Sequence, residues 1–77
     1  MILDSELLEI LAEAVKTRQR KEELERSIGR AVRRNNLDFK IYIRIVDELR
    51  EVMGRKKISL ESAANVCLEE GKNKPNQ

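Results

Sequence analysis

The sequence predicts an all-α protein, a compact bundle of about four short amphipathic helices. Apolar residues recur at spacings of three and four, and polar or turn-forming residues separate these stretches. With 77 residues, 40% of them apolar, the chain can build one small core. We expect a single domain over residues 1–71 and a disordered tail over 72–77. The helices are expected over approximately 4–19, 21–35, 37–54 and 59–70.

The first two helices are separated by a change in the direction of the apolar stripe. Asp4 or Ser5 can cap the first helix. A fully polar run, TRQRKEE, follows at residues 17–23. If a single helix continued through this run, the second apolar stripe would lie about 90° around the helix axis from the first. A break near residues 18–22 is therefore expected. The first stripe contains Leu7, Leu8, Leu11, Ala14 and Val15, and the second contains Leu24, Ile28, Ala31 and Val32.

The segment FKIYIRIV, residues 39–46, alternates as a strand would, yet it also fits a longer helix. On a helix over residues 38–54, Lys40, Arg44, Asp47, Glu48 and Glu51 lie opposite an apolar face about 160° wide. Since this pattern covers more of the chain than the alternation does, we expect a helix. The apolar face contains Phe39, Ile41, Tyr42, Ile45, Val46, Leu49, Val52 and Met53.

Turn and cap residues delimit the third and fourth helices. Asn36 is a candidate N-cap for the third helix, and Gly54 is expected to end it. Ser59 is placed to cap the fourth helix, with Ile58 before it as a hydrophobic staple. Gly71 is expected to close that helix. Its apolar face contains Leu60, Ala63, Ala64, Cys67 and Leu68.

The residue inventory argues against an enzyme. Histidine is absent and the three glycines are isolated, so the commonest general base and a phosphate-binding loop are both missing. Cys67 is expected to be a small buried apolar residue. Cofactors and a small-molecule substrate are not expected. The serines, which lack a partner base, are expected to be caps or surface residues: Ser5, Ser27, Ser59 and Ser62.

The single cysteine fits a cytoplasmic protein, and charge and hydropathy patterning argue against membrane binding. No apolar run reaches the length of about 20 residues that spans a bilayer. The polar face of the first helix is acidic, which disfavours anionic lipid. Richness in Lys and Glu is typical of proteins from hot-growing organisms.

An arginine stripe is the clearest cationic feature. Arg26, Arg30, Arg33 and Arg34 follow helical spacing along the second helix, and guanidinium groups suit phosphates. This pattern favours electrostatic binding of nucleic acid. The alternative is a solvated helix face with its charge offset by nearby acids, and the sequence offers no aromatic pair for base stacking.

Residues 39–71 resemble a ribbon-helix-helix unit, in which a strand at 39–45 would pair with a second chain. The resemblance rests on FKIYIRIV, then DELREVMG, then ISLESAANVCLEEG. It implies a DNA-binding dimer that reads the major groove with Lys40, Tyr42 and Arg44. This fold is the alternative to the four-helix bundle.

KISLES, residues 57–62, is similar to the latter half of an EF-hand loop. In that register the loop would begin at Glu51, and Met53 and Arg55 would occupy positions that need oxygen ligands. A tight EF-hand site is thereby excluded. Weak binding of a divalent cation such as calcium by clustered carboxylates stays an alternative, with Glu61, Glu69 and Glu70 as candidate ligands.

The leading functional hypothesis is a non-enzymatic module that binds a protein partner, or a second copy of itself. Wide apolar helix faces, a small core and missing catalytic groups support it. The partner surface is expected on the third helix, at Tyr42, Leu49 and Met53.

Overall fold

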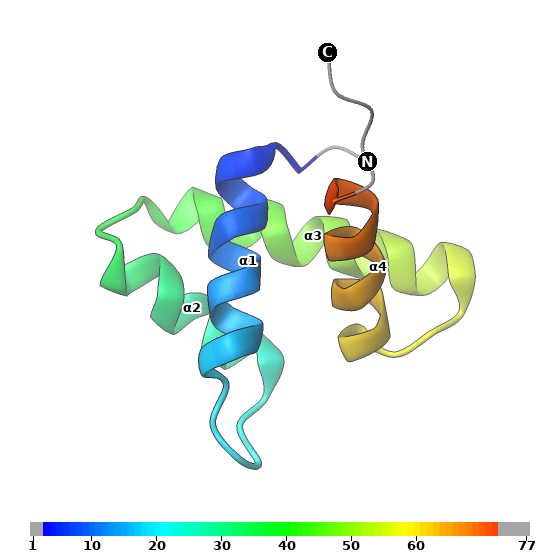
Figure 1. Ribbon diagram of the computed structural model, residues 1–77, viewed down its shortest axis with the longest axis horizontal. Coiled ribbons are helices and arrows are strands. Elements are labelled where there is room, and N and C mark those ends of the chain that lie inside the picture. The colour runs from blue at the N-terminus through cyan, green and yellow to red at the C-terminus, as the bar shows by residue number, and fades with distance from the viewer. Residues whose placement is uncertain (1–2, 73–77) are drawn as a thin grey trace.

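Four α-helices account for most of the computed structural model, which describes residues 3–72 (Figure 1). They are α1 (Ser5–Thr17), α2 (Leu24–Arg34), α3 (Phe39–Lys56) and α4 (Leu60–Lys72). The predicted all-α bundle is confirmed. The strand expected for a ribbon-helix-helix unit is wrong, because residues 39–45 form the first turns of α3. Apart from Lys72, the expected tail lies outside the described residues.

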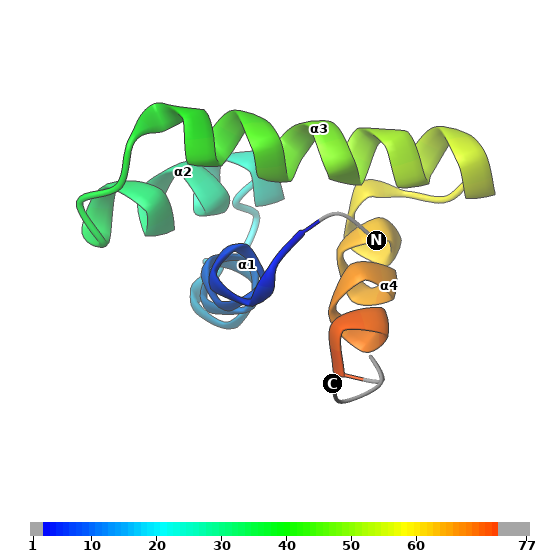
Figure 2. The same ribbon diagram turned by 90° about the horizontal axis from the view of Figure 1, so that it is seen from above.

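The helices form two layers, with α2 and α3 on one side and α1 and α4 on the other (Figure 2). The shortest dimension, 20 Å, matches two helix diameters. α1 and α4 run antiparallel across α3, and α1 packs most extensively on α2 (Figure 1). The core between the layers contains Leu3, Leu7, Ile10, Leu11, Ala14, Leu24, Ile28, Ala31, Val32, Ile45, Val46, Leu49, Val52, Ala63, Ala64 and Cys67.

Side-chain caps place the helix starts close to where the sequence predicts them. The Asp4 carboxylate accepts the Leu7 backbone N–H at 3.0 Å, and the Ser59 hydroxyl accepts the Ser62 N–H at 3.1 Å. Asn36 is not the cap of α3. It takes a left-handed conformation (φ 57°), and Asp38 accepts the Lys40 N–H at 2.8 Å instead. The N-cap of α3 is therefore Asp38, two residues after the predicted Asn36.

The break between α1 and α2 is confirmed and is wider than expected, spanning residues 18–23. Lys21 adopts a positive φ of 68° at its tip. The Glu22 carboxylate accepts the Gln19 N–H at 2.9 Å, and the Glu22 N–H donates to the Gln19 carbonyl at 3.0 Å. These local hydrogen bonds stabilise a turn that contains neither Gly nor Pro.

Both glycines expected to end helices lie inside them. Gly54 sits within α3, which continues to Lys56 and ends at Lys57 in the left-handed conformation (φ 55°). Gly71 lies within α4, where a Cβ would come within 2.5 Å of a Leu8 methyl carbon. Its role is close packing of α4 against α1, not helix termination.

Two polar residues that were expected at the surface are buried. Ser27 is 0% exposed, and its hydroxyl donates to the Ala14 carbonyl at 2.6 Å across the α1–α2 contact. Glu48 is 5% exposed although it was placed opposite the apolar face of α3. α3 crosses both helices of the other layer, so it buries a wider face than contact with a single helix would require (Figure 2).

Candidate functional site

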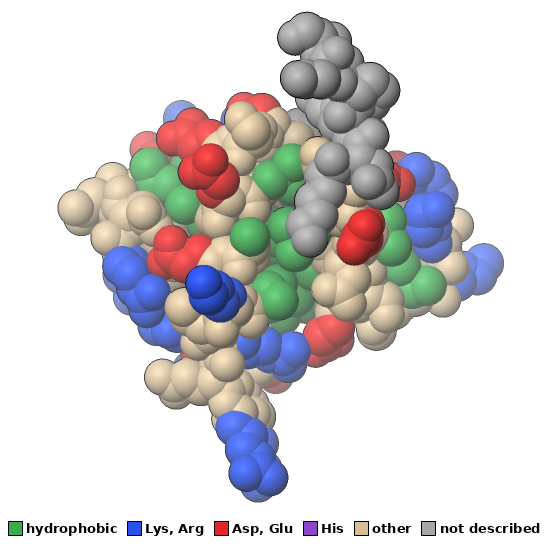
Figure 3. Space-filling model, viewed as in Figure 1, with side chains coloured by type: hydrophobic (Ala, Val, Ile, Leu, Met, Phe, Trp, Pro, Cys, Tyr) green, Lys and Arg blue, Asp and Glu red, His purple; other side chains and the backbone are tan. Residues whose placement is uncertain are grey.

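An apolar groove lies between α1 and α4. Its volume is about 530 Å³. Figure 3 shows hydrophobic side chains gathered on this face, between the two antiparallel helices. We call this feature the α1–α4 groove, and it is lined by Ser5, Leu8, Glu9, Ala12, Val15, Lys16, Asn65, Leu68, Glu69 and Gly71.

The floor of the α1–α4 groove comes from apolar residues that the core leaves uncovered. Leu8, Ala12 and Val15 follow i, i+4 and i+7 spacing beside the buried stripe of α1. Val15 is 36% exposed, whereas Leu8 and Leu68 are half-buried. The first helix thus has more apolar surface than its contacts use. This second apolar stripe on the first helix is the sequence feature that indicates a groove. It was missed because Leu8 and Val15 were assigned to the buried face.

Each end of the groove has a contact that involves at least one of its two helices. At one end Gly71 admits the Leu8 side chain. At the other, the Arg18 guanidinium lies 3.0 Å from the Glu61 carboxylate. A smaller hollow of about 220 Å³ continues toward this ion pair, and both hollows are lined by Val15 and Asn65. The groove is therefore built into the packing of α1 against α4.

Charge separates between the two layers. α1 and α4 each carry three Glu and one Lys, which makes −4 together. α2 carries four Arg and one Glu, and α3 carries five bases and three acids, which makes +5 together. The chain as a whole is +2. An apolar groove between acidic helices and a basic opposite layer are thus two distinct surfaces.

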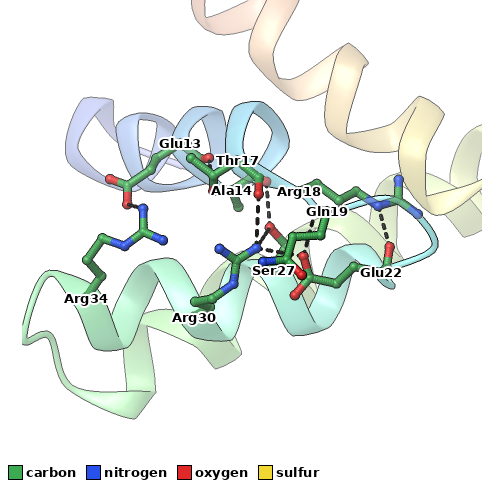
Figure 4. A network of polar contacts seen from close by, with 9 residues as sticks. All are labelled: Glu13, Ala14, Thr17, Arg18, Gln19, Glu22, Ser27, Arg30 and Arg34. Atoms are coloured by element: carbon green, nitrogen blue, oxygen red, sulfur yellow. Dashed lines mark hydrogen bonds and ion pairs between the residues drawn. The ribbon is translucent and has the colours of Figure 1, made fainter.

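Two residues of the predicted arginine stripe form ion pairs, and Figure 4 shows both of them, Arg30 and Arg34. Arg30 lies 2.6 Å from the Glu22 carboxylate and also donates to the Thr17 carbonyl at 3.1 Å. Arg34 pairs with Glu13 of α1 at 3.1 Å. Arg26 and Arg33 are exposed and take part in none of the ion pairs found within residues 3–72. Half of the stripe therefore links helices.

The Arg30 network also perturbs an acid. The Gln19 backbone N–H, followed by the Arg30 guanidinium, lowers the pKa of the Glu22 carboxyl. Glu22 is only 10% exposed, so the pair closes the α1–α2 turn against α2. The geometry of this cluster fits a structural role.

Exposed Arg33 lies beside the two aromatic residues of the chain. A hollow of about 250 Å³ is lined by Gly29, Arg33, Phe39 and Tyr42, among others. The Phe39 and Tyr42 rings stack with centroids 5.0 Å apart and planes at 21°. The expectation that an aromatic pair is missing is therefore wrong, because α3 brings these two residues together at i, i+3.

The candidate metal ligands do not converge. Within residues 3–72, no group of three or more acidic, Cys or His side chains is placed to hold a metal ion. Glu61 pairs with Arg18 near the start of α4, whereas Glu69 and Glu70 lie two turns further along the helix. Because Glu61 is two helical turns away from Glu69 and Glu70 on α4, the three predicted ligands do not form one cluster.

The expected partner surface on α3 is partly wrong. Leu49 is 0% exposed and belongs to the core, because α3 turns this position toward the other layer. Tyr42 and Met53 are half-buried and pack against the core. The exposed large apolar residues of α3 are instead Phe39, at 64%, and Ile43, at 43%. Both lie in the first two turns of α3, and this end of α3 extends beyond α1 (Figure 2).

The cysteine is placed for packing. Cys67 is 0% exposed, as expected from its sequence context. Burial, followed by the neighbouring Glu48 and Glu70 carboxylates, raises the pKa of its thiol to about 11. A thiol that stays protonated inside the core is a poor nucleophile.

Comparison with known proteins finds no matching family model, no matching curated protein and no matching solved structure. Across residues 3–72, no helix combines the length and the apolar character needed to cross a membrane.

Proposed function

We propose that this chain is a non-enzymatic protein-binding module whose α1–α4 groove takes an amphipathic helix with basic flanks. The observation that carries the proposal is the groove itself, an apolar hollow of about 530 Å³ lined by α1 and α4. Exposed apolar grooves rimmed by polar residues are typical sites for an amphipathic helix.

The length of the groove limits the size of the partner. The lining residues of α1 run from Ser5 to Lys16. Eleven helical steps at about 1.5 Å each span roughly 16 Å. This distance accommodates about three turns of a partner helix, with apolar anchors over Leu8, Ala12 and Val15.

The charge around the groove selects the flanks of the partner. The two helices that frame it sum to −4, and Glu9 and Glu69 stand in its lining. Lys or Arg beside the apolar stripe of a partner helix would meet these carboxylates, whereas Glu would be repelled. Because the contact is short, we expect a dissociation constant of about 10–100 µM.

A designed peptide tests the proposal directly. The probe is a helical peptide of about 15 residues, or about four turns, with Leu and Ala on one face and Lys on the other. We expect it to shift the amide NMR signals of α1 and α4 around Ala12 and Leu68. A peptide with Glu in place of Lys should bind at least about tenfold more weakly. Equal binding of both peptides would refute the charge argument.

Variants locate the binding surface. Ala12→Arg fills the groove with a bulky cation at an exposed position and should abolish peptide binding while the protein stays folded. Gln19→Arg adds the same charge on an exposed loop residue outside the groove and should bind normally. Shifts confined to α2 and α3, or normal binding by Ala12→Arg, would overturn the proposal. Sedimentation of the free protein tests whether a second copy occupies the groove instead.

A further inference from the structure

The geometry points to a second binding surface, on the basic layer, that takes single-stranded nucleic acid. We propose that an unpaired base stacks on the exposed face of Phe39 while Arg33 and Lys40 contact the adjoining phosphates. This surface is separate from the α1–α4 groove, so it neither depends on nor follows from the protein-binding proposal.

The stacking platform is an aromatic pair with one exposed ring. Phe39 is 64% exposed, the most exposed large apolar residue described in the chain. Its ring stacks on Tyr42 at 5.0 Å, and Tyr42 in turn is half-buried. A Cβ at Gly29 of α2 would lie 3.7 Å from the Tyr42 ring, which is ordinary contact. The pair therefore rests on α2, and a base added to Phe39 would extend an existing stack.

Positive charge lies beside this platform on α2, and a second cation follows Phe39 in the sequence of α3. Arg33 of α2 lines the same hollow as Phe39 and Tyr42. Lys40 is the next residue of α3, and it is exposed and outside the ion pairs found in residues 3–72. The one acid nearby in sequence, Asp38, is engaged as the cap of α3 through the Lys40 N–H at 2.8 Å.

The surface favours a single strand over a duplex. A free aromatic face can engage only a base whose own face is exposed, and duplex bases are already stacked on their neighbours. Arg33 and Lys40 supply the backbone contacts that a flexible strand needs. The basic layer, at +5, adds long-range attraction for a polyanion.

Fluorescence anisotropy with labelled oligothymidylate of about 12 nucleotides tests the inference at low salt. We expect binding whose affinity falls steeply as salt is raised, and at least about tenfold weaker binding of a duplex of similar length. Tighter binding of the duplex, or no binding of either probe, would overturn the inference. Amide shifts around Phe39 would distinguish this site from the α1–α4 groove, where the Ala12→Arg variant acts.

Matched variants separate stacking from bulk charge. Phe39→Leu keeps an apolar side chain but removes the ring, and should weaken oligothymidylate binding about tenfold, whereas Phe39→Trp should keep it. Arg33→Gln should weaken binding severalfold and flatten its salt dependence. Arg34→Gln makes the same charge change at the neighbouring residue, which pairs with Glu13, and should have a smaller effect. Equal losses in the two arginine variants, or normal binding by Phe39→Leu, would show non-specific attraction instead.

Discussion

Replacing Gly54 by Ala should stabilise the protein, and the sign of the change tests where α3 ends. Gly54 lies inside α3, and a Cβ built there meets nothing within 4 Å. Its φ is not positive. Ala is favoured over Gly by about 0.8–1.0 kcal/mol in a helix interior. Because Gly54 is in the last turn, where fraying reduces the gain, we expect about 0.5 kcal/mol.

If α3 ended at Gly54, the Gly54→Ala substitution would destabilise the protein instead. If Gly54 closed α3 in a left-handed conformation, Ala would be strained there and would destabilise the protein by about 1 kcal/mol. In the structure Lys57 takes that conformation, with φ 55°. Its N–H and that of Ile58 turn back to the Met53 carbonyl, the latter at 3.3 Å. Lys57→Gly should therefore also stabilise, by about 0.5 kcal/mol, because relief of strain exceeds the added freedom of the unfolded chain.

Urea unfolding followed by far-ultraviolet circular dichroism measures both changes. We expect higher midpoints with unchanged slopes, and a Tm increase of roughly 2–4 °C for each variant. Gly29→Ala, inside α2, serves as a comparison in which the added Cβ gains helix propensity and also makes ordinary contact with Tyr42. A lower midpoint for Gly54→Ala would refute a continuous α3 through Lys56.

Three further predictions concern the core and the surface. Ser27→Ala should cost about 1 kcal/mol in urea unfolding, because it removes the buried hydrogen bond to the Ala14 carbonyl. The raised pKa of Cys67 predicts full stability below pH 9.0, the ordinary thiol value, and a loss as pH rises toward about 11, since the unfolded thiol ionises first. Unfolding titrations of Cys67→Ala should lack that part of the pH dependence. A double-mutant cycle on Arg18 and Glu61, both partly exposed, should give a coupling below about 1 kcal/mol that falls with salt.

Helix existence was predictable here because local periodicity and capping agree along most of the chain. Asp4 and Ser59 start helices as expected, and the reversal at 18–23 follows from the shift in stripe direction. The helix over 39–56 was preferred to a strand because a wide apolar face over many residues outweighs a short alternation. These are signals carried by neighbours in sequence.

Helix ends and polar burial were harder to predict because they depend on distant contacts. Gly71 reads as a terminator in sequence, yet it is needed where Leu8 approaches from α1. Ser27 reads as a surface residue, yet α1 presents the Ala14 carbonyl to it. Glu48 becomes buried because α3 is covered by helices on more than one side. None of these partners lies within one helical turn.

The two proposed surfaces also depend partly on local sequence patterns and partly on contacts between distant helices. The α1–α4 groove arises from a second apolar stripe on α1, which the sequence carries, and from the antiparallel placement of α4, which it does not reveal. The aromatic platform arises from an i, i+3 pair that is visible in sequence, but its exposure follows from α3 extending beyond the opposite layer.

Segregation of charge by layer links the two proposed surfaces. Among the ion pairs found within residues 3–72, Glu13–Arg34 at 3.1 Å joins helices of the two layers, and it is a partly exposed contact of the kind that contributes little to stability. Such an arrangement therefore does little for the fold, whereas it gives each layer its own field. An acidic apolar groove and a basic aromatic platform on one small bundle would attract different classes of partner. The groove would repel a polyanion, and the platform would repel a basic helix. Under the two proposals, occupying one surface would leave the other free, so a basic helix and a polyanion would be bound at the same time.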